Sequence, residues 1–71
     1  MAIMADVKIG TRVKEERVKR FWTQDKLAQE ADLSSRQVVR IEANEVKPRF
    51  STILKIAEAL GVDPNELVER N

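Results

Sequence analysis

Apolar side chains recur along this chain at intervals of three and four residues, which is the period of one face of a helix. Two runs largely follow this period, one near each end of the chain: Ile9 and Val13 and then Val18 with Phe21, and further on Ile53, Leu54, Ala57 and Leu60. They predict a first helix over residues 7–20 and a fourth over residues 51–60, which Gly61 ends. Strand-type alternation is absent from the sequence, so we expect an all-α fold.

Three further helix starts each combine a capping residue with a pair of apolar residues that brackets it. The caps are Thr23, Ser34 and Asp63, and the bracketing pairs are Trp22 with Leu27, Leu33 with Val38, and Val62 with Leu67. Gln37 completes a capping box at the second start; Glu66 completes one at the third, where Pro64 takes the first helical position. These starts predict helices over residues 24–31, 35–43 and 64–69, so five helices in all. An aromatic side chain such as Trp22 can also stack on a nucleic-acid base, but the placement of Leu27 favours the role of Trp22 in the apolar pair at this helix start.

The helices predicted over residues 24–31 and 35–43 are joined so tightly that they must cross at a steep angle. A crossing of this kind needs a small side chain at the point of contact, and Ala28 provides one. The inward-facing positions of the two helices are all apolar: Leu27, Ala31, Leu33, Val38 and Ile41. The pattern therefore predicts a helix-turn-helix motif over about residues 24–43.

The stretch TQDKLAQEADLSSRQVVRIE resembles the helix-turn-helix of the Cro and phage-repressor family, also called the XRE family. KEERVKRFWTQ resembles the family's first helix, and NEVKPRFSTILKIAEALGVDPNELV resembles its fourth and fifth helices and the loop before them, so the resemblance covers about residues 9 to 69. It implies a compact five-helix, lambda-repressor-like DNA-binding domain over residues 7–71, after an N-terminal tail of residues 1–6.

The chain departs from the family pattern at a few turn positions. The family usually has Gly where this chain has Asp32 and Asn44, and Asp and Asn both tolerate the left-handed backbone expected there. Arg49 stands where a Ser often begins the fourth helix, and Glu45 puts an anion in a loop expected near phosphate.

The resemblance implies sequence-specific binding of double-stranded DNA by a small transcriptional regulator, a repressor, with its third helix in the major groove. The N-terminal end of that helix leads into the groove. The candidates for base readout are therefore Ser35, Arg36, Gln37 and Arg40. Arg36 and Arg40 lie four residues apart on the outward face, and arginine can donate two hydrogen bonds to guanine. The alternatives are that both are solvated helix charges, that Ser35 only starts the helix, and that Gln37 serves only its capping box.

Phosphate contacts are expected from Gln24, Lys47 and Arg49, with Arg12 a weaker candidate. In the family, a glutamine at the place of Gln24 approaches the DNA backbone and braces the start of the recognition helix. The family also commonly pairs an Arg and a Glu at the places of Arg17 and Glu42, so we expect a partly buried ion pair there that orients the motif without touching DNA.

Composition excludes several other kinds of site. With no cysteine and no histidine, the chain has no disulfide, no thiolate or imidazole metal ligand, and no nucleophile activated by histidine. We therefore expect no catalytic residues, no metal, no cofactor and no small-molecule ligand. No apolar run approaches the roughly 20 residues that cross a membrane, and no signal peptide is visible, so a cytoplasmic location is expected. The net charge of +1 is unevenly spread, basic in residues 1–20 and acidic in residues 51–71, which is weak evidence for an oriented electrostatic surface.

One domain of this size contacts only half of a two-fold site, so the expected partner is a palindromic DNA operator bound by a homodimer. Val62, Leu67 and Val68 around the fifth helix are the first candidates for the dimer contact, although the core can absorb all three. The competing hypothesis is a protein-interaction module, or an antitoxin-like domain that binds a protein partner with the same fold.

Overall fold

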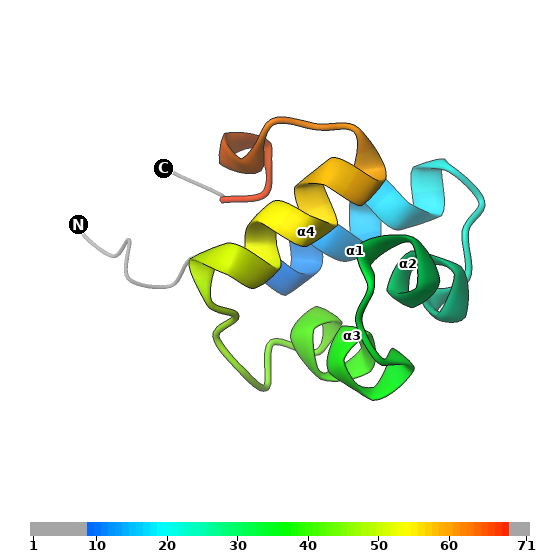
Figure 1. Ribbon diagram of the computed structural model, residues 1–71, viewed down its shortest axis with the longest axis horizontal. Coiled ribbons are helices and arrows are strands. Elements are labelled where there is room, and N and C mark those ends of the chain that lie inside the picture. The colour runs from blue at the N-terminus through cyan, green and yellow to red at the C-terminus, as the bar shows by residue number, and fades with distance from the viewer. Residues whose placement is uncertain (1–8, 69–71) are drawn as a thin grey trace.

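The computed structural model describes residues 9–68, which form four α-helices and one short 3-10 helix (Figure 1). The elements are α1 (Ile9–Lys19), α2 (Gln24–Ala31), α3 (Ser35–Glu42), α4 (Phe50–Leu60) and the 3-10 helix η2 (Pro64–Glu66). Three parts of the predicted structure lie outside the described residues: the tail over residues 1–6, the first two residues of the predicted first helix, and the last residue of the predicted fifth helix. The all-α fold is confirmed for the described part of the chain.

The core lies between α4 and the other helices. α4 packs against α1, α2 and η2, while α3 packs against α1 and α2 (Figure 1). The side chains of Val13, Leu27, Val38, Ile56 and Leu67 are completely buried, so every element contributes to or adjoins one apolar cluster. Trp22 and Leu33 are partly buried against that cluster, which fits a capping role for both.

The turn between α2 and α3 forms as expected. Thr23 Oγ1 accepts a hydrogen bond from the Lys26 N–H at the start of α2, and Ser34 and Gln37 form the reciprocal capping box at the start of α3. Asp32 ends α2 with a left-handed φ of 58°, and Ala28 is buried. Asn44 is also left-handed, with a φ of 60°. Asp and Asn thus replace glycine at both turns.

The predicted fifth helix is wrong in type and length. Only Pro64–Glu66 is helical, as a single 3-10 turn, and η2 ends where Leu67 enters the core. The Asp63 carboxylate accepts from the Asn65 N–H, two residues on, and within residues 9–68 no bond returns from the Glu66 side chain to the Asp63 N–H. Bonds of the i→i+3 type, from the Leu67 N–H to the Pro64 carbonyl for example, tighten the turn.

The other helix boundaries lie within one or two residues of the predictions. α2 matches, α3 ends one residue early at Glu42, and α4 begins one residue early at Phe50. Arg49 precedes α4 without a side-chain cap, as its replacement of serine suggests.

The apolar face predicted for the first helix is partly wrong. α1 buries Gly10, Val13 and Glu16, while Val18 is 51% exposed and Phe21, beyond the helix end, is 96% exposed. Buried Glu16 is tolerated because its carboxylate accepts from Lys19 Nζ and Arg20 Nη1, each at 3.1 Å. The hydrogen bond from Lys19, together with that from Arg20, lowers the pKa of Glu16, although burial of the carboxylate acts in the opposite direction.

Candidate nucleic-acid interface

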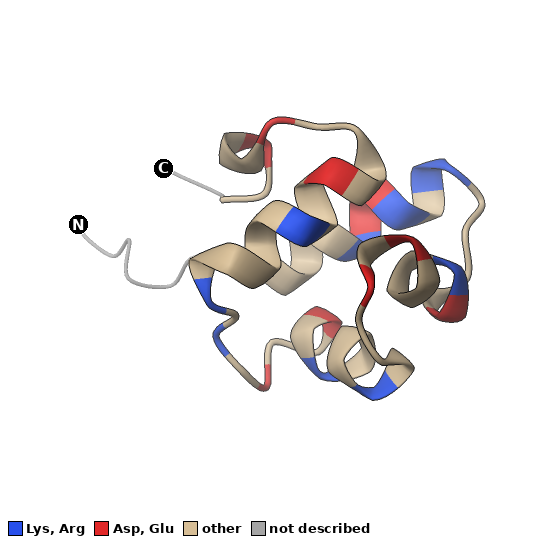
Figure 2. Cartoon of the chain, in the orientation of Figure 1, with Lys and Arg blue, Asp and Glu red and all other residues tan. Residues whose placement is uncertain are grey.

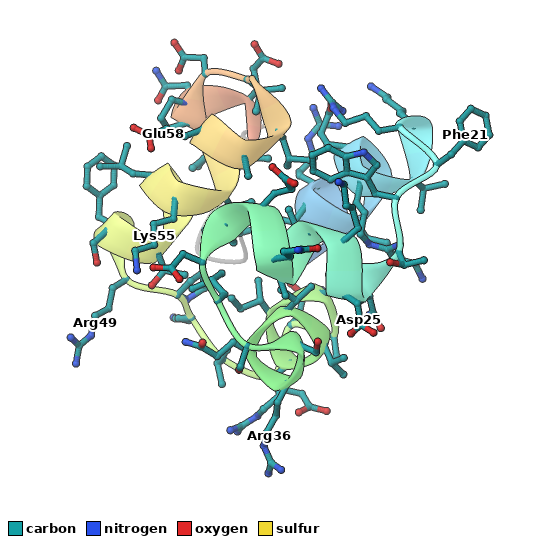
Figure 3. All side chains as sticks on the ribbon, turned by 45° about the vertical axis from the view of Figure 1, so that its right-hand side comes forward. Phe21, Asp25, Arg36, Arg49, Lys55 and Glu58 are labelled. Atoms are coloured by element: carbon teal, nitrogen blue, oxygen red, sulfur yellow. The ribbon has the colours of Figure 1, made fainter. Side chains whose placement is uncertain are left out.

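The two faces of α3 differ in the way the sequence predicts. Val38, Ile41 and Glu42 are buried against the other helices, whereas Ser35, Arg36, Gln37, Val39 and Arg40 are exposed. Figure 3 shows the Arg36 side chain extending away from the molecule. A helix with one face fully held by the core presents the other face rigidly, which suits insertion into a groove of fixed shape.

The two arginines of α3 are held differently. Arg40 Nε lies 3.6 Å from Glu45 Oε1 in the loop after α3, a loose and solvent-exposed ion pair. Among residues 9–68 nothing forms a hydrogen bond or ion pair with the Arg36 guanidinium, so all five of its N–H groups are free to donate. Gln37 uses only part of its hydrogen-bonding capacity within the protein: its Oε1 accepts from the Ser34 N–H, while its amide hydrogens stay available.

Ser35 has a partner that the sequence did not indicate. Its hydroxyl donates a hydrogen bond to the carboxylate of Asp25, near the start of α2. Figure 3 shows Asp25 at the end of α2 that approaches α3. The available signal was positional, since both residues lie in the first turns of two helices that are joined by a tight turn and cross.

Lys47 and Arg49 lie exposed in the segment between α3 and α4. Together with Gln37 and Arg40 they line a hollow of about 380 Å³, to which the nearly buried Ile41 also contributes. The structure therefore brings four of the seven expected contact residues to the rim of one depression. Figure 2 shows cationic segments of α3 at the bottom of the view and of the loop before α4 at its lower left, with an acidic segment at the lowest point of that loop.

Glu42, at the C-terminal end of α3, joins three parts of the chain. Arg17 Nε and Nη2 donate to its two carboxylate oxygens at 2.7 and 3.0 Å, and Gln24 Nε2 donates to it at 3.1 Å. Arg17 Nη1 also donates to the Trp22 carbonyl at 2.7 Å. The side chains of Arg17 and Glu42 are only 12% and 3% exposed, and their hydrogen bonds raise the pKa of Arg17 although burial opposes the rise.

Two residues expected to contact phosphate already form hydrogen bonds within the protein. The Gln24 carboxamide turns inward to Glu42, so its contribution at the surface is mainly the backbone at the start of α2. Arg12 donates to the Glu66 carbonyl at 3.1 Å and pairs with Glu15 at 2.9 Å, so it links α1 to η2.

Other kinds of site find little support in the described residues. Residues 9–68 contain no cluster of three or more acidic side chains arranged to hold a metal ion. None of the described helices combines the length and the apolar character that spanning a bilayer requires.

Comparison with known proteins identifies relatives over most of the chain. A family model described as helix-turn-helix matches residues 13–67. The chain is 37% identical over 60 residues to the immunity repressor protein of Bacillus phage phi105, a match that spans 84% of this chain but only 42% of the relative.

Two solved structures are similar in fold as well as sequence. The restriction-modification controller protein C.AhdI from Aeromonas hydrophila is 34% identical with a TM-score of 0.82, over 86% of this chain and 92% of that one. The N-terminal DNA-binding domain of SinR from Bacillus subtilis is 25% identical with a TM-score of 0.82, over 89% of this chain and 93% of that one.

Proposed function

Because the chain belongs to the helix-turn-helix family, of the Cro and phage-repressor type, we propose that it binds double-stranded DNA sequence-specifically and regulates transcription as a repressor. The observation that carries the proposal is the exposed face of α3, on which Arg36 and Arg40 point outward while Val38 and Ile41 are fixed in the core. Such a protein works in the cytoplasm, where its DNA is.

In the proposed complex α3 lies in the major groove, led by its N-terminal turn. Arg36 and Arg40 donate to guanine O6 and N7, with Ser35 and Gln37 at neighbouring bases. Lys47, Arg49 and the start of α2 at Gln24 hold the phosphates on either side, which fixes the position of α3 without reading sequence. Arg17 and Glu42 hold α3 against α1 and do not contact DNA.

The protein is proposed to bind a palindromic operator as a homodimer, since one α3 reads only half of a site. Leu67 is completely buried in its own chain, so it cannot form the dimer contact considered from the sequence. Val62 and Val68 are half-buried and remain candidates for that contact.

Selection of bound duplexes from a random pool tests the proposal. We expect two inverted half-sites about one helical turn apart, each containing guanine. Arg40→Ala should lower discrimination at one base pair of each half-site by roughly five- to 150-fold, because a bidentate contact contributes about 1–3 kcal/mol of discrimination. An equal loss on every sequence would instead make Arg40 a phosphate contact.

Failure of the wild-type protein to enrich any sequence would reject DNA readout. The same fold would then serve as a protein-interaction or antitoxin-like module. Sedimentation of the protein with and without its selected duplex tests the homodimer separately, because two protomers per duplex are expected.

A further inference from the structure

The hydrogen bond between Ser35 and Asp25 joins the two helix N-termini on the proposed DNA face. A carboxylate has no hydrogen to give, so the serine hydroxyl is the donor and the Asp25 oxygen the acceptor. A serine hydroxyl carries a single hydrogen, and here that hydrogen is used inside the protein. Ser35 and Asp25 can therefore offer only lone pairs to an outside partner.

The neighbouring serine shows the opposite arrangement. Ser34 Oγ accepts a hydrogen bond from the Gln37 N–H at 3.1 Å, and its own hydroxyl hydrogen has no acceptor among residues 9–68. Ser34 can thus donate outward, to a phosphate for example, while Ser35 can only accept. The two adjacent serines at the start of α3 therefore have opposite hydrogen-bonding roles, because Ser34 accepts and Ser35 donates within the protein.

Acceptor-only groups are selective in the major groove. Guanine O6 and N7, thymine O4 and the phosphate oxygens are themselves acceptors, whereas adenine N6 and cytosine N4 carry amino groups that donate. An unrestrained serine rotates its hydroxyl to suit either kind of partner, and so distinguishes bases poorly. A serine whose hydrogen is held by a carboxylate loses that freedom.

We propose, resting on the proposed function, that Asp25 makes Ser35 an acceptor-only reader, which requires adenine or cytosine at the base facing the first turn of α3. Asp25 is the positioning residue and Ser35 the contact. The negative charge of Asp25 reinforces the choice, because it repels base acceptors and attracts amino groups. The half-site then combines an amino-bearing base for Ser35 with guanine for Arg36 or Arg40.

The experiment compares duplexes selected from one random pool by the wild-type protein and by three variants, Asp25→Ala, Ser35→Ala and Glu30→Ala. Glu30 is the matched control, an exposed anion of α2 that pairs with Lys26 at 3.1 Å within its own helix. Thermal unfolding by circular dichroism confirms that each variant is folded.

We expect the wild type to select adenine or cytosine at one position of each half-site. Asp25→Ala should admit guanine and thymine at that position, because the freed hydroxyl can donate, and Ser35→Ala should lose the preference altogether. Glu30→Ala should leave every base preference unchanged, because Glu30 borders a hollow that it shares with Asp32, Lys55 and Glu58 and that does not include α3. A purely structural role for Asp25 would lower stability or overall affinity and leave base frequencies unchanged.

A second measurement removes only the amino group. In the selected duplex, purine replaces adenine, or 2-pyrimidinone replaces cytosine, at the position assigned to Ser35. The wild type should lose roughly three- to tenfold in affinity, the size of one hydrogen bond, and Ser35→Ala should lose nothing further.

The failures of the two proposals are distinguishable. If the wild type selects a sequence but Asp25→Ala selects the same bases at every position, the role of Asp25 is rejected and DNA readout stands. If the wild type enriches no sequence, the proposed function is rejected and the role of Asp25 with it.

Discussion

At the scale of single residues, Phe21 combines a left-handed backbone, which a bulky residue rarely adopts, with an exposed aromatic ring. Its φ is +58°, a conformation that brings Cβ close to the neighbouring carbonyl, and its ring is 96% exposed. Because the ring packs on almost nothing, Phe21→Gly removes strain without loss of packing. We expect the free energy of unfolding to rise by about 1 kcal/mol, measured by urea denaturation.

Phe21→Ala is the control for that prediction, because it removes the ring and keeps Cβ. Its stability should match the wild type. Equal stabilisation by alanine and glycine would show that the exposed ring, and not the backbone, is the unfavourable element.

The sequence predicted some left-handed residues and missed this one. Asp32 and Asn44 are residue types that tolerate a positive φ and stand where the family has glycine, so both were predictable. Phe21 follows Val18 at a helical interval, which made it look like part of a buried face. Periodicity reports which residues are apolar but not where the helix stops, and α1 ends at Lys19.

Between elements, α1 comes close to the end of α3 at Gly10. A Cβ on Gly10 would lie 1.9 Å from the Ile41 carbonyl oxygen and 2.8 Å from Asn44 Oδ1, which already accepts from the Gly10 N–H at 3.1 Å. Gly10→Ala must therefore push α1 away from α3. We expect a loss of about 1–3 kcal/mol in the free energy of unfolding.

The sign of this change is informative. In an exposed helix, Gly→Ala is stabilising by roughly 1 kcal/mol because alanine is the better helix former. A stabilised Gly10→Ala protein in urea denaturation would mean that α1 can move off α3 at little cost, contrary to the close approach of Gly10 to Ile41.

The ion pair of Arg17 and Glu42 also joins α1 to α3, and a double-mutant cycle measures its contribution. Either Arg17→Met or Glu42→Ala leaves a nearly buried charge without its partner, so each is expected to cost about 3–5 kcal/mol. The double variant should be far more stable than the sum of the two losses implies, since it leaves no unpaired charge. Additive losses in urea denaturation would show that the two residues act independently.

Local signals determined how well each element could be predicted. The caps at Thr23 and Ser34 are short-range features, and α2 and α3 begin where they indicate. Asp63 and Pro64 give an equally clear start, but a capping signal does not set the length of the helix that it begins. η2 stops after one turn where Leu67 packs into the core, and burial of that kind depends on the tertiary structure rather than on a local capping signal.

For the whole molecule, the sequence could identify the contact residues one by one but not their arrangement. Lys47 and Arg49 reach the rim shared with Gln37 and Arg40 because the chain folds back after α3. That fold-back depends on Asn44, whose side chain binds both the Gly10 N–H and Thr11 Oγ1 on α1. A contact between residues more than thirty positions apart is not visible in local patterns.

The shared rim leads to a prediction about the electrostatics of the complete DNA-binding face. If Lys47 contacts a phosphate, its binding releases condensed counterions, and the logarithm of affinity falls steeply with the logarithm of salt concentration. Lys47→Gln should weaken binding to all sequences alike and reduce that slope by about 1.

Lys55→Gln is the matched control, because it removes the same charge from an exposed lysine of α4. Lys55 borders a different hollow, lined by Glu30, Asp32 and Glu58, where acidic side chains disfavour DNA. The salt slope of Lys55→Gln, measured by titration of the selected duplex at several salt concentrations, should therefore match the wild type. If both substitutions reduce the slope equally, affinity depends on the net charge of the molecule, and the rim formed by α3 and the loop after it has no special part in holding phosphate.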